Sequence, residues 1–196
     1  KPGEIVEFHK GIVKHEFYSK NTDNHMCAME YIYFARPDSV VEGKNVHAFR
    51  KETGAILARE DKDLHADLVI GVPDSSLSAA IGYAEQAQIP FETGLIKNRY
   101  VGRTFIQPTQ AMRDRSVRLK LSPVSSVVKG KSIVMIDDSI VRGTTSRRIV
   151  QLLKDAGATQ VHVRIASPVI TSPCFYGVDT STKDQLIGAR LSVDEI

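Results

Sequence analysis

The sequence predicts an α/β fold in which a parallel sheet carries helices on both faces. Four short segments are apolar almost throughout, as strands are when both faces of their sheet are covered. Segments with helical periodicity lie between them along the chain, and this alternation favours parallel strands. With 196 residues, the chain is long enough for one main domain with a large buried core.

Three elements are expected in the first sixty residues. Glu4–Tyr18 alternates in part around a glycine, which predicts a hairpin or two short strands. The stretch MEYIYFARPDS at 29–39 is rich in aromatic residues and ends in Arg-Pro-Asp-Ser, which indicates a short strand running into a turn. Apolar residues recur at helical spacing through Asn45–Glu60, so we predict an amphipathic helix there.

The strands of the predicted sheet lie in the remaining two thirds of the chain. Helical periodicity runs from Ser75 to Ala87 and over 149–156, and Gly157 is placed to end the second helix. Ligands of parallel sheets bind beyond the carboxyl ends of the strands, so residues at those ends become site candidates. The four strand segments are Ala66–Pro73, Ile89–Lys97, Ser132–Asp137 and Val161–Ser167.

The strongest candidate site follows the strand at 132–137. Two adjacent acids, Asp137 and Asp138, end the apolar run, and a glycine and hydroxyl-rich loop then leads into a helix. The unpaired amides of a helix N-terminus suit a phosphate group, whereas the acids suit ribose hydroxyls or a magnesium ion. A helix cap alone would not explain two acids at the end of a buried strand. The loop consists of Arg142, Gly143, Thr144, Thr145 and Ser146.

A second strand-to-helix junction occurs in GVPDSS at 71–76. It offers another anion site, and Ser75 can supply an oxygen to a metal, although a plain helix cap is the alternative. The arginine-rich stretch 98–116 fits neither period, and we expect a lid or else an irregular but rigid surface segment. Two anion sites and these cations predict one ligand that carries a phosphate, a ribose and a pyrophosphate.

Composition and charge exclude several classes of protein. The formal net charge is +3, and basic residues are not interleaved with aromatic ones, so we expect no nucleic-acid partner. No apolar run approaches the roughly 20 residues that span a bilayer, and no secretory signal is visible. We therefore expect a cytoplasmic protein without a membrane partner. The G-x-x-x-x-G-K-[ST] and G-x-G-x-x-G nucleotide motifs are absent.

Several stretches of the chain resemble one family. VMIDDSIVRGTTS at 134–146 resembles the phosphoribosyl pyrophosphate (PRPP) signature of type I phosphoribosyltransferases. With four further stretches, the chain is similar over nearly its whole length to the glutamine phosphoribosylpyrophosphate amidotransferases. These stretches are CAMEYIYFARPDS (27–39), GVPDSSLSAAIGYA (71–84), GLIKNRYVGRTFIQPTQAMR (94–113) and PCFYGVDTST (173–182).

The resemblance implies a type I phosphoribosyltransferase fold with a flexible catalytic lid. The implied reaction converts PRPP and ammonia to 5-phosphoribosylamine and pyrophosphate, the first committed step of purine synthesis. Magnesium would be bound by Ser75, Asp137 and Asp138. The 5-phosphate would lie on Arg142–Ser146, and the pyrophosphate on Pro73, Asp74, Ser75 and Ser76. The lid would span 97–104, with Lys97, Arg99, Tyr100 and Arg103 as its catalytic residues.

The resemblance also implies parts of a longer protein. Residues 1–20 resemble the tail of an N-terminal glutaminase domain, which supplies the ammonia from glutamine. Residues 21–196 resemble a phosphoribosyltransferase domain that is truncated at its C-terminus. In the whole protein we expect a homo-oligomer that purine nucleotides inhibit.

The two cysteines have two interpretations. One branch of the family carries a 4Fe–4S cluster on four cysteines, and Cys27 and Cys174 match two of those positions. Because four thiolates are normally needed, we expect the cluster in the full-length parent and an incomplete set in this chain. The alternative is a pair of incidental thiols.

Two other functions compete with the amidotransferase reaction. One is another type I phosphoribosyltransferase that salvages a nucleobase, and the second is a non-catalytic regulator that senses PRPP with the same fold. The cysteine motifs and the KNRYVGRTF lid disfavour the salvage enzyme. No added nucleic-acid-binding segment is visible that would favour the regulator.

Overall fold

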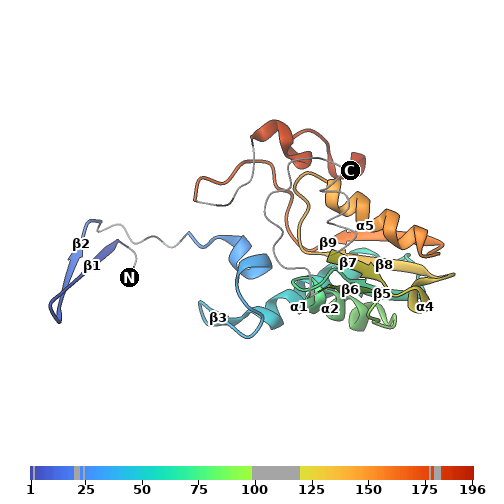
Figure 1. Ribbon diagram of the computed structural model, residues 1–196, viewed down its shortest axis with the longest axis horizontal. Coiled ribbons are helices and arrows are strands. Elements are labelled where there is room, and N and C mark those ends of the chain that lie inside the picture. The colour runs from blue at the N-terminus through green and yellow to red at the C-terminus, as the bar shows by residue number, and fades with distance from the viewer. Residues whose placement is uncertain (2, 20–22, 24, 99–119, 177, 179–181) are drawn as a thin grey trace.

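A three-stranded parallel sheet lies at the centre of the molecule (Figure 1). The computed structural model describes residues 1, 3–19, 23, 25–98, 120–176, 178 and 182–196. The strand order is β5-β8-β9, and both neighbouring pairs are parallel, as predicted. The strands are β5 (Leu68–Gly71), β8 (Ser132–Asp137) and β9 (Gln160–Ile165).

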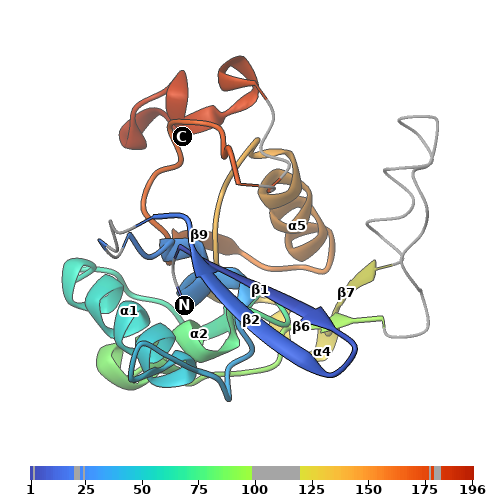
Figure 2. The same cartoon turned by 90° about the vertical axis from the view of Figure 1, so that its left-hand side faces the viewer.

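Helices cover both faces of this sheet, which confirms the predicted layers (Figure 2). The helix α5 (Thr144–Asp155) lies on one face, and α1 (Val46–Glu60) and α2 (Leu77–Ala87) lie on the other. Gly157 follows α5 with a positive φ of 98°, so it ends this helix as predicted. Within the described residues, no helix has the length and apolar character needed to cross a bilayer.

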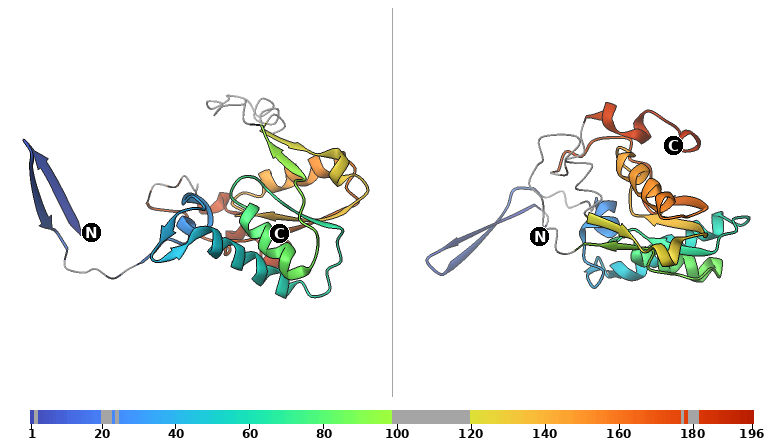
Figure 3. Two further views of the ribbon diagram at one scale, coloured as in Figure 1. Left: turned by 90° about the horizontal axis from the view of Figure 1, so that it is seen from below. Right: turned by 45° about the vertical axis from the view of Figure 1, so that its right-hand side comes forward.

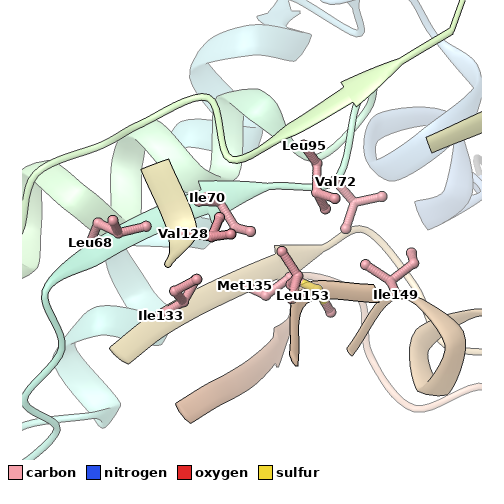
Figure 4. Packing of buried hydrophobic residues seen from close by; sticks show 9 residues of the cluster. All are labelled: Leu68, Ile70, Val72, Leu95, Val128, Ile133, Met135, Ile149 and Leu153. Carbon is pink, nitrogen blue, oxygen red and sulfur yellow. The ribbon is translucent and has the colours of Figure 1, made fainter. Parts of the chain in front are cut away.

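The core divides into two clusters because side chains alternate along each strand. Ile133 and Met135 of β8 face α5, where they meet Ile149 and Leu153 (Figure 4). Val134 and Ile136 of β8 face the opposite way and pack with α1 and α2; the residues that they meet are Ala58, Ala79, Ala80, Tyr83 and Ala84. All four β8 side chains are fully buried, so the central strand holds both layers in place.

The predicted strand at 89–97 is only partly present. Phe91 forms a single parallel bridge to Val69, and regular pairing resumes at β6 (Leu95–Lys97). This strand pairs with β7 (Leu121–Pro123) in an antiparallel ribbon rather than with the central sheet. A short helix, α4 (Ser125–Val128), follows β7.

The N-terminal hairpin of β1 (Glu4–His9) and β2 (Ile12–Phe17) is confirmed. It lies apart from the rest of the molecule in both views of Figure 3. Its large apolar side chains remain exposed, most of all Phe8 at 77%. A small antiparallel ribbon, β3 (Val40–Val41) with β4 (Lys44–Asn45), precedes α1.

The predicted strand within 29–39 is wrong, because this stretch forms a π-helical turn, η1 (Glu30–Phe34). The buried side chain of Arg50 donates from Nε to the carbonyl of Tyr31 (2.6 Å) and from Nη2 to that of Ala35 (2.9 Å). These contacts hold a compact turn against α1, where an extended strand would leave the guanidinium without its partners. The chain ends in three 3₁₀ turns: η2 (Lys183–Gln185), η3 (Ile187–Ala189) and η4 (Val193–Glu195).

Candidate functional site

The two predicted strand-to-helix junctions lie side by side. Their strands, β5 and β8, are neighbours, and Gly71 pairs with Ile136 at the carboxyl end. The pairing continues one residue further, because the amide of Val72 donates to the carbonyl of Ile136 at 2.9 Å. Both loops therefore leave the sheet at the same edge, where ligands of parallel α/β sheets bind.

Side chains of the two loops contact each other directly. The Ser75 hydroxyl donates to Oδ2 of Asp138, and the Ser76 hydroxyl donates to Oδ1 of Asp137 at 3.3 Å. Residues predicted separately from two motifs thus form one cluster. Asp74 and the Pro73–Asp74 peptide bond, which is cis, lie at the rim of this cluster, and Asp74 is exposed.

The acidic pair is buried, with Asp137 and Asp138 exposed by 7% and 8%. Asp137 accepts from the amide of Asp138 at 2.9 Å, and Asp138 accepts from the hydroxyl of Ser139 at 2.7 Å. Burial, followed by the charge of Asp138, raises the pKa of Asp137 to about 6. The donors in these four hydrogen bonds are serine hydroxyls and a backbone amide, which carry no charge. The two adjacent carboxylates are therefore suited to bind a cation.

The oxygen atoms of this cluster match the ligand preference of magnesium. Carboxylates and hydroxyls are hard oxygen donors, and Mg²⁺ is usually held by one or two carboxylates together with substrate oxygens and water. Asp137, Asp138 and Ser75 provide such a set. Across the described part of the chain, no group of three or more His, Cys, Asp and Glu residues is placed to hold a metal ion.

The glycine and hydroxyl-rich loop leads directly into α5. Gly143 is the N-terminal cap of this helix and has a φ of 76°, which L side chains rarely adopt. The first amides of the helix therefore follow a turn that only glycine forms readily, and they are available to an anion. Thr144 and Thr145 are exposed beside them, whereas Ser146 is buried at 8% exposure. Arg142 is exposed and donates to Gln185.

The predicted catalytic lid falls almost entirely outside the described residues. Arg99, Tyr100 and Arg103 belong to the segment 99–119, which the structure does not describe. Lys97, at the end of β6, is described, and its Nζ lies 2.6 Å from Oδ2 of Asp74. This ion pair brings the first lid residue to the Pro73–Ser76 loop, even though β6 is not a strand of the parallel sheet.

Neither Cys27 nor Cys174 forms a disulfide bond; the first is exposed and the second is half-buried. The amide of Tyr176 donates to Sγ of Cys174 at 3.3 Å. Hydrogen bonds from the amides of Tyr176 and Val178 lower the pKa of the Cys174 thiol. Neither cysteine belongs to a complete metal-ligand cluster within the described residues.

Two residues beside the cluster were not identified from the sequence. Arg50 is 4% exposed, and the charge of Asp138 acts on its guanidinium. Burial lowers the pKa of Arg50, and the attraction of Asp138 opposes that effect. Gln185 contacts Arg142 from 43 residues away. A lone Arg on a helix and a Gln near the C-terminus carry no sequence signal of either contact.

The fold and the two-loop site define a phosphoribosyltransferase. The family model described as phosphoribosyl transferase domain matches residues 42–174, and the chain belongs to this family. Within it, the chain is similar to the amidophosphoribosyltransferases. It is 61% identical over 196 residues to that of Bacillus subtilis (strain 168) and 58% identical over 194 residues to that of Staphylococcus aureus (strain MRSA252). It is also 55% identical over 195 residues to that of Synechocystis sp..

The chain spans about two fifths of the length of these curated relatives. It covers 41% of the B. subtilis protein and 39% of each of the other two, while 99–100% of the chain is aligned. Solved structures also match the chain over its whole length, including these two. One, described as the structure of the allosteric regulatory enzyme of purine biosynthesis, has a TM-score of 0.84 at 61% identity, with 42% of its chain covered. The second is glutamine PRPP amidotransferase from B. subtilis complexed with ADP and GMP, with a TM-score of 0.85 at 60% identity and 43% covered.

Proposed function

We propose that this domain transfers the phosphoribosyl group of PRPP to ammonia, forming 5-phosphoribosylamine and pyrophosphate in the first committed step of purine biosynthesis. The observation that carries the proposal is the contact between two anion-binding loops through Ser75 with Asp138 and Ser76 with Asp137. A ligand with phosphates at both ends and a sugar between them fits this arrangement. The amidophosphoribosyltransferase relatives support the choice of reaction.

Each part of the site has a role in this reaction. The α5 N-terminus and its loop, Arg142–Ser146, would hold the 5-phosphate through amides and hydroxyls. The loop Pro73–Ser76 would bind the pyrophosphate, and Asp137 and Asp138 the ribose hydroxyls. The bond between the anomeric carbon and the pyrophosphate oxygen breaks as ammonia attacks that carbon, so positive charge develops on the sugar ring. No side chain needs to act as a nucleophile, because positioning and electrostatics carry the rate.

A magnesium ion on Ser75, Asp137 and Asp138 would neutralise charge on the leaving pyrophosphate. The cationic lid residues would add to this, and we propose Lys97, Arg99, Tyr100 and Arg103 as the catalytic group. The Lys97 contact with Asp74 supports a lid that begins beside the pyrophosphate loop. When PRPP is bound, we expect Lys97 to exchange this exposed carboxylate for a phosphate oxygen.

The whole protein would supply the ammonia from glutamine, with residues 1–20 belonging to a glutaminase domain and 21–196 to the transferase domain. The hairpin supports this division, because Val6, Phe8, Val13 and Phe17 share one apolar face that remains exposed. We also propose a homo-oligomer inhibited by purine nucleotides; the B. subtilis relative complexed with ADP and GMP supports the inhibition.

We further propose that Cys27 and Cys174 supply two of four ligands to a 4Fe–4S cluster in the full-length parent. Neither forms a disulfide bond, and the lowered pKa of Cys174 favours the thiolate that binds iron. We also propose a cytoplasmic location, where reducing conditions would keep both thiols available to a cluster. Iron and sulfide analysis of the full-length protein tests the cluster, and its absence would leave two incidental thiols.

An assay of pyrophosphate release tests the reaction. Purified protein is incubated with PRPP, magnesium and ammonium chloride, and pyrophosphate is measured with and without the ammonium salt. Ammonia-dependent release is the expected result. Release that requires a purine base would indicate a salvage enzyme, and PRPP binding without any release would indicate a regulator.

A further inference from the structure

We propose that Gln185 is a positioning residue for the phosphate loop, and that the C-terminal turn which carries it is part of the site. The turn comprises residues 185–187, where η2 ends and η3 begins. The inference rests on the proposed function in one respect, namely that the ligand of the loop Arg142–Ser146 is a phosphate group. It adds a segment that no sequence motif places at the site.

Two hydrogen bonds join this turn to the first residue of the loop and to the residue just before it. Oε1 of Gln185 accepts from Nε of Arg142 at 3.1 Å. The amide of Ile187 donates to the carbonyl of Val141 at 2.8 Å. One bond holds a side chain and the other holds the backbone, so both the path of the loop and the direction of its cation are restrained.

The turn is anchored by burial rather than resting on the surface. Leu186, which lies between the two bonding residues, is fully buried. Gly188, directly after the turn, lies so close to Val169 that an added Cβ would be 2.4 Å from Cγ1 of that residue. On the loop side, Cδ1 of Ile187 lies 2.8 Å from the position of a Cβ on Gly143. The loop glycine is thus enclosed by the turn, in addition to needing a positive φ.

The type of contact at Arg142 suits phosphate binding. Arg142 is exposed, and a free arginine side chain loses roughly 2 kcal/mol of rotamer entropy when a ligand orders it. The Gln185 oxygen occupies only Nε and therefore leaves the terminal nitrogens of the guanidinium for a ligand. Since the acceptor is neutral, it orients the cation without cancelling its charge.

Three variants test the inference. Gln185→Ala removes the acceptor oxygen, and because Gln185 is exposed the core stays intact. Gln185→Met keeps the length of the side chain but offers no oxygen to Nε of Arg142. Gln151→Ala is the matched control, since Gln151 lies on α5 but bonds to Asp155 at the far end of that helix. The readouts are the KM and kcat for PRPP, and the Kd of ribose 5-phosphate from calorimetry.

Gln185→Ala should raise both the Kd of ribose 5-phosphate and the KM for PRPP roughly five- to tenfold, as expected for one lost orienting hydrogen bond. Its kcat should change less than twofold. Gln185→Met should raise both constants to within about twofold of the Gln185→Ala values, because it also lacks the acceptor oxygen, and Gln151→Ala should leave them unchanged. In an Arg142→Met background, Gln185→Ala should have no further effect, because Gln185 acts through Arg142.

An unchanged Kd in Gln185→Ala would overturn the inference while leaving the proposed function in place. Wild-type constants in Gln185→Met, or an additive loss in the Arg142→Met background, would also overturn it, because Gln185 would then act by packing and not through Arg142. A wild-type protein that neither binds ribose 5-phosphate nor releases pyrophosphate would instead overturn the proposed function, and the phosphate role of Gln185 with it.

Discussion

At the scale of single residues, the acidic pair opposes the stability of the ligand-free domain. Asp137 and Asp138 are consecutive and buried, and burial, followed by the charge of Asp138, disfavours ionisation of Asp137. Hydrogen bonds from Ser75 and Ser76 offset only part of that cost. The proposed role in ligand binding would account for keeping such a pair despite its cost.

Asp137→Asn should therefore stabilise the ligand-free protein and impair the reaction. The asparagine keeps an oxygen for the amide of Asp138 and removes one charge, so the free energy of unfolding at pH 8 should rise by roughly 1–3 kcal/mol. Ammonia-dependent pyrophosphate release should fall at least about a hundredfold. Urea unfolding without ligands and the release assay measure the two effects.

Asp63→Asn is the control for this substitution, because Asp63 is exposed and should change stability by less than about 0.5 kcal/mol. An Asp137→Asn protein that releases pyrophosphate normally would mean that the pair serves only as a helix cap.

Arg50→Gln should destabilise the fold far more than loss of an ordinary surface arginine. It removes the bonds to the carbonyls of Tyr31 and Ala35, and it removes the buried cation whose charge Asp138 attracts. We expect a loss of roughly 2–4 kcal/mol in the free energy of unfolding, measured by urea titration. Arg50→Lys should not restore it, since one ammonium cannot reproduce the planar fork that reaches both carbonyls.

Arg59→Gln provides the matched control on the same helix. Arg59 is half-exposed and pairs with Glu52, so its loss should cost less than about 1 kcal/mol. Equal losses in the Arg50 and Arg59 variants would contradict the role assigned to the buried arginine.

At the scale of elements, α1 and α2 cross at an unusually close distance. A Cβ added at Gly54 of α1 would lie 1.8 Å from the carbonyl oxygen of Ala79 in α2. A Cβ added at Gly82 of α2 would lie 1.8 Å from the carbonyl oxygen of Lys51 in α1. Reciprocal glycines thus allow backbone-to-backbone contact, which places the start of α2, and with it Ser76, against the sheet.

Gly82→Ala should destabilise the protein even though alanine favours helices. In an unobstructed helix, alanine is more stable than glycine by about 1 kcal/mol. Here its methyl group would collide with the backbone of Lys51, which can move only if α1 moves as a whole. We expect a net loss of about 3 kcal/mol or more, measured by thermal or urea unfolding. Gln86→Ala on the exposed side of the same helix should lie within about 0.5 kcal/mol of wild type, and a stabilised Gly82→Ala protein would contradict the close crossing.

The elements that carry the site could be predicted from sequence because their patterns are local. Strands β5 and β8 are continuous apolar runs, and the acids and hydroxyls that follow them mark the two loops. The turn η1 could not be predicted, because its aromatic residues favour a strand locally and the contact that decides otherwise comes from Arg50. Apolar spacing also predicts the buried face of α1 only in part, because the apolar Ile56 is 43% exposed while Arg50 and Gly54 are buried.

The same distinction applies to the candidate site. Ser75, Asp137 and Asp138 were identified because residue type and position after a strand both point to ligand binding. Gln185 contacts Arg142, which is 43 residues away, and Arg50 contacts the backbone of Tyr31 and Ala35, which are 19 and 15 residues away. Without those contacts, neither residue type suggests a role. Long-range partners of this kind become visible only when the fold brings them together.

At the scale of the whole molecule, one network joins three elements on the α1 and α2 face. Asp61, directly after α1, accepts from Nη2 of Arg164 in β9 at 2.7 Å and from the hydroxyl of Tyr83 in α2 at 2.8 Å. Burial would raise the pKa of Asp61, but the bonds from Arg164 and Tyr83 outweigh it and lower the pKa below 3.8. The same hydrogen bond raises the pKa of Arg164, so both partners are shifted toward their charged forms.

This network should contribute to acid stability. Because the folded-state pKa of Asp61 is depressed, its contribution is present above pH 4 or so and is lost as the pH falls through the folded-state pKa. Asp61→Asn should reduce the free energy of unfolding at pH 7 by roughly 2 kcal/mol, between the values for exposed and buried pairs. The deficit should shrink toward low pH, as measured by urea titrations from pH 3 to 7. A deficit independent of pH would contradict an ionised Asp61.

The adjacency of β5 and β8 has a consequence for folding kinetics. Ser75 and Asp138 are 63 residues apart, so their contact must await closure of a long loop and pairing of two parallel strands. Contacts of such high sequence separation form slowly, because the chain loses the entropy of loop closure before the pairing of the strands can stabilise it. No partly folded chain that lacks the β5–β8 pairing can hold both halves of the site. Ligand binding during refolding should therefore appear together with the last cooperative step, never before it.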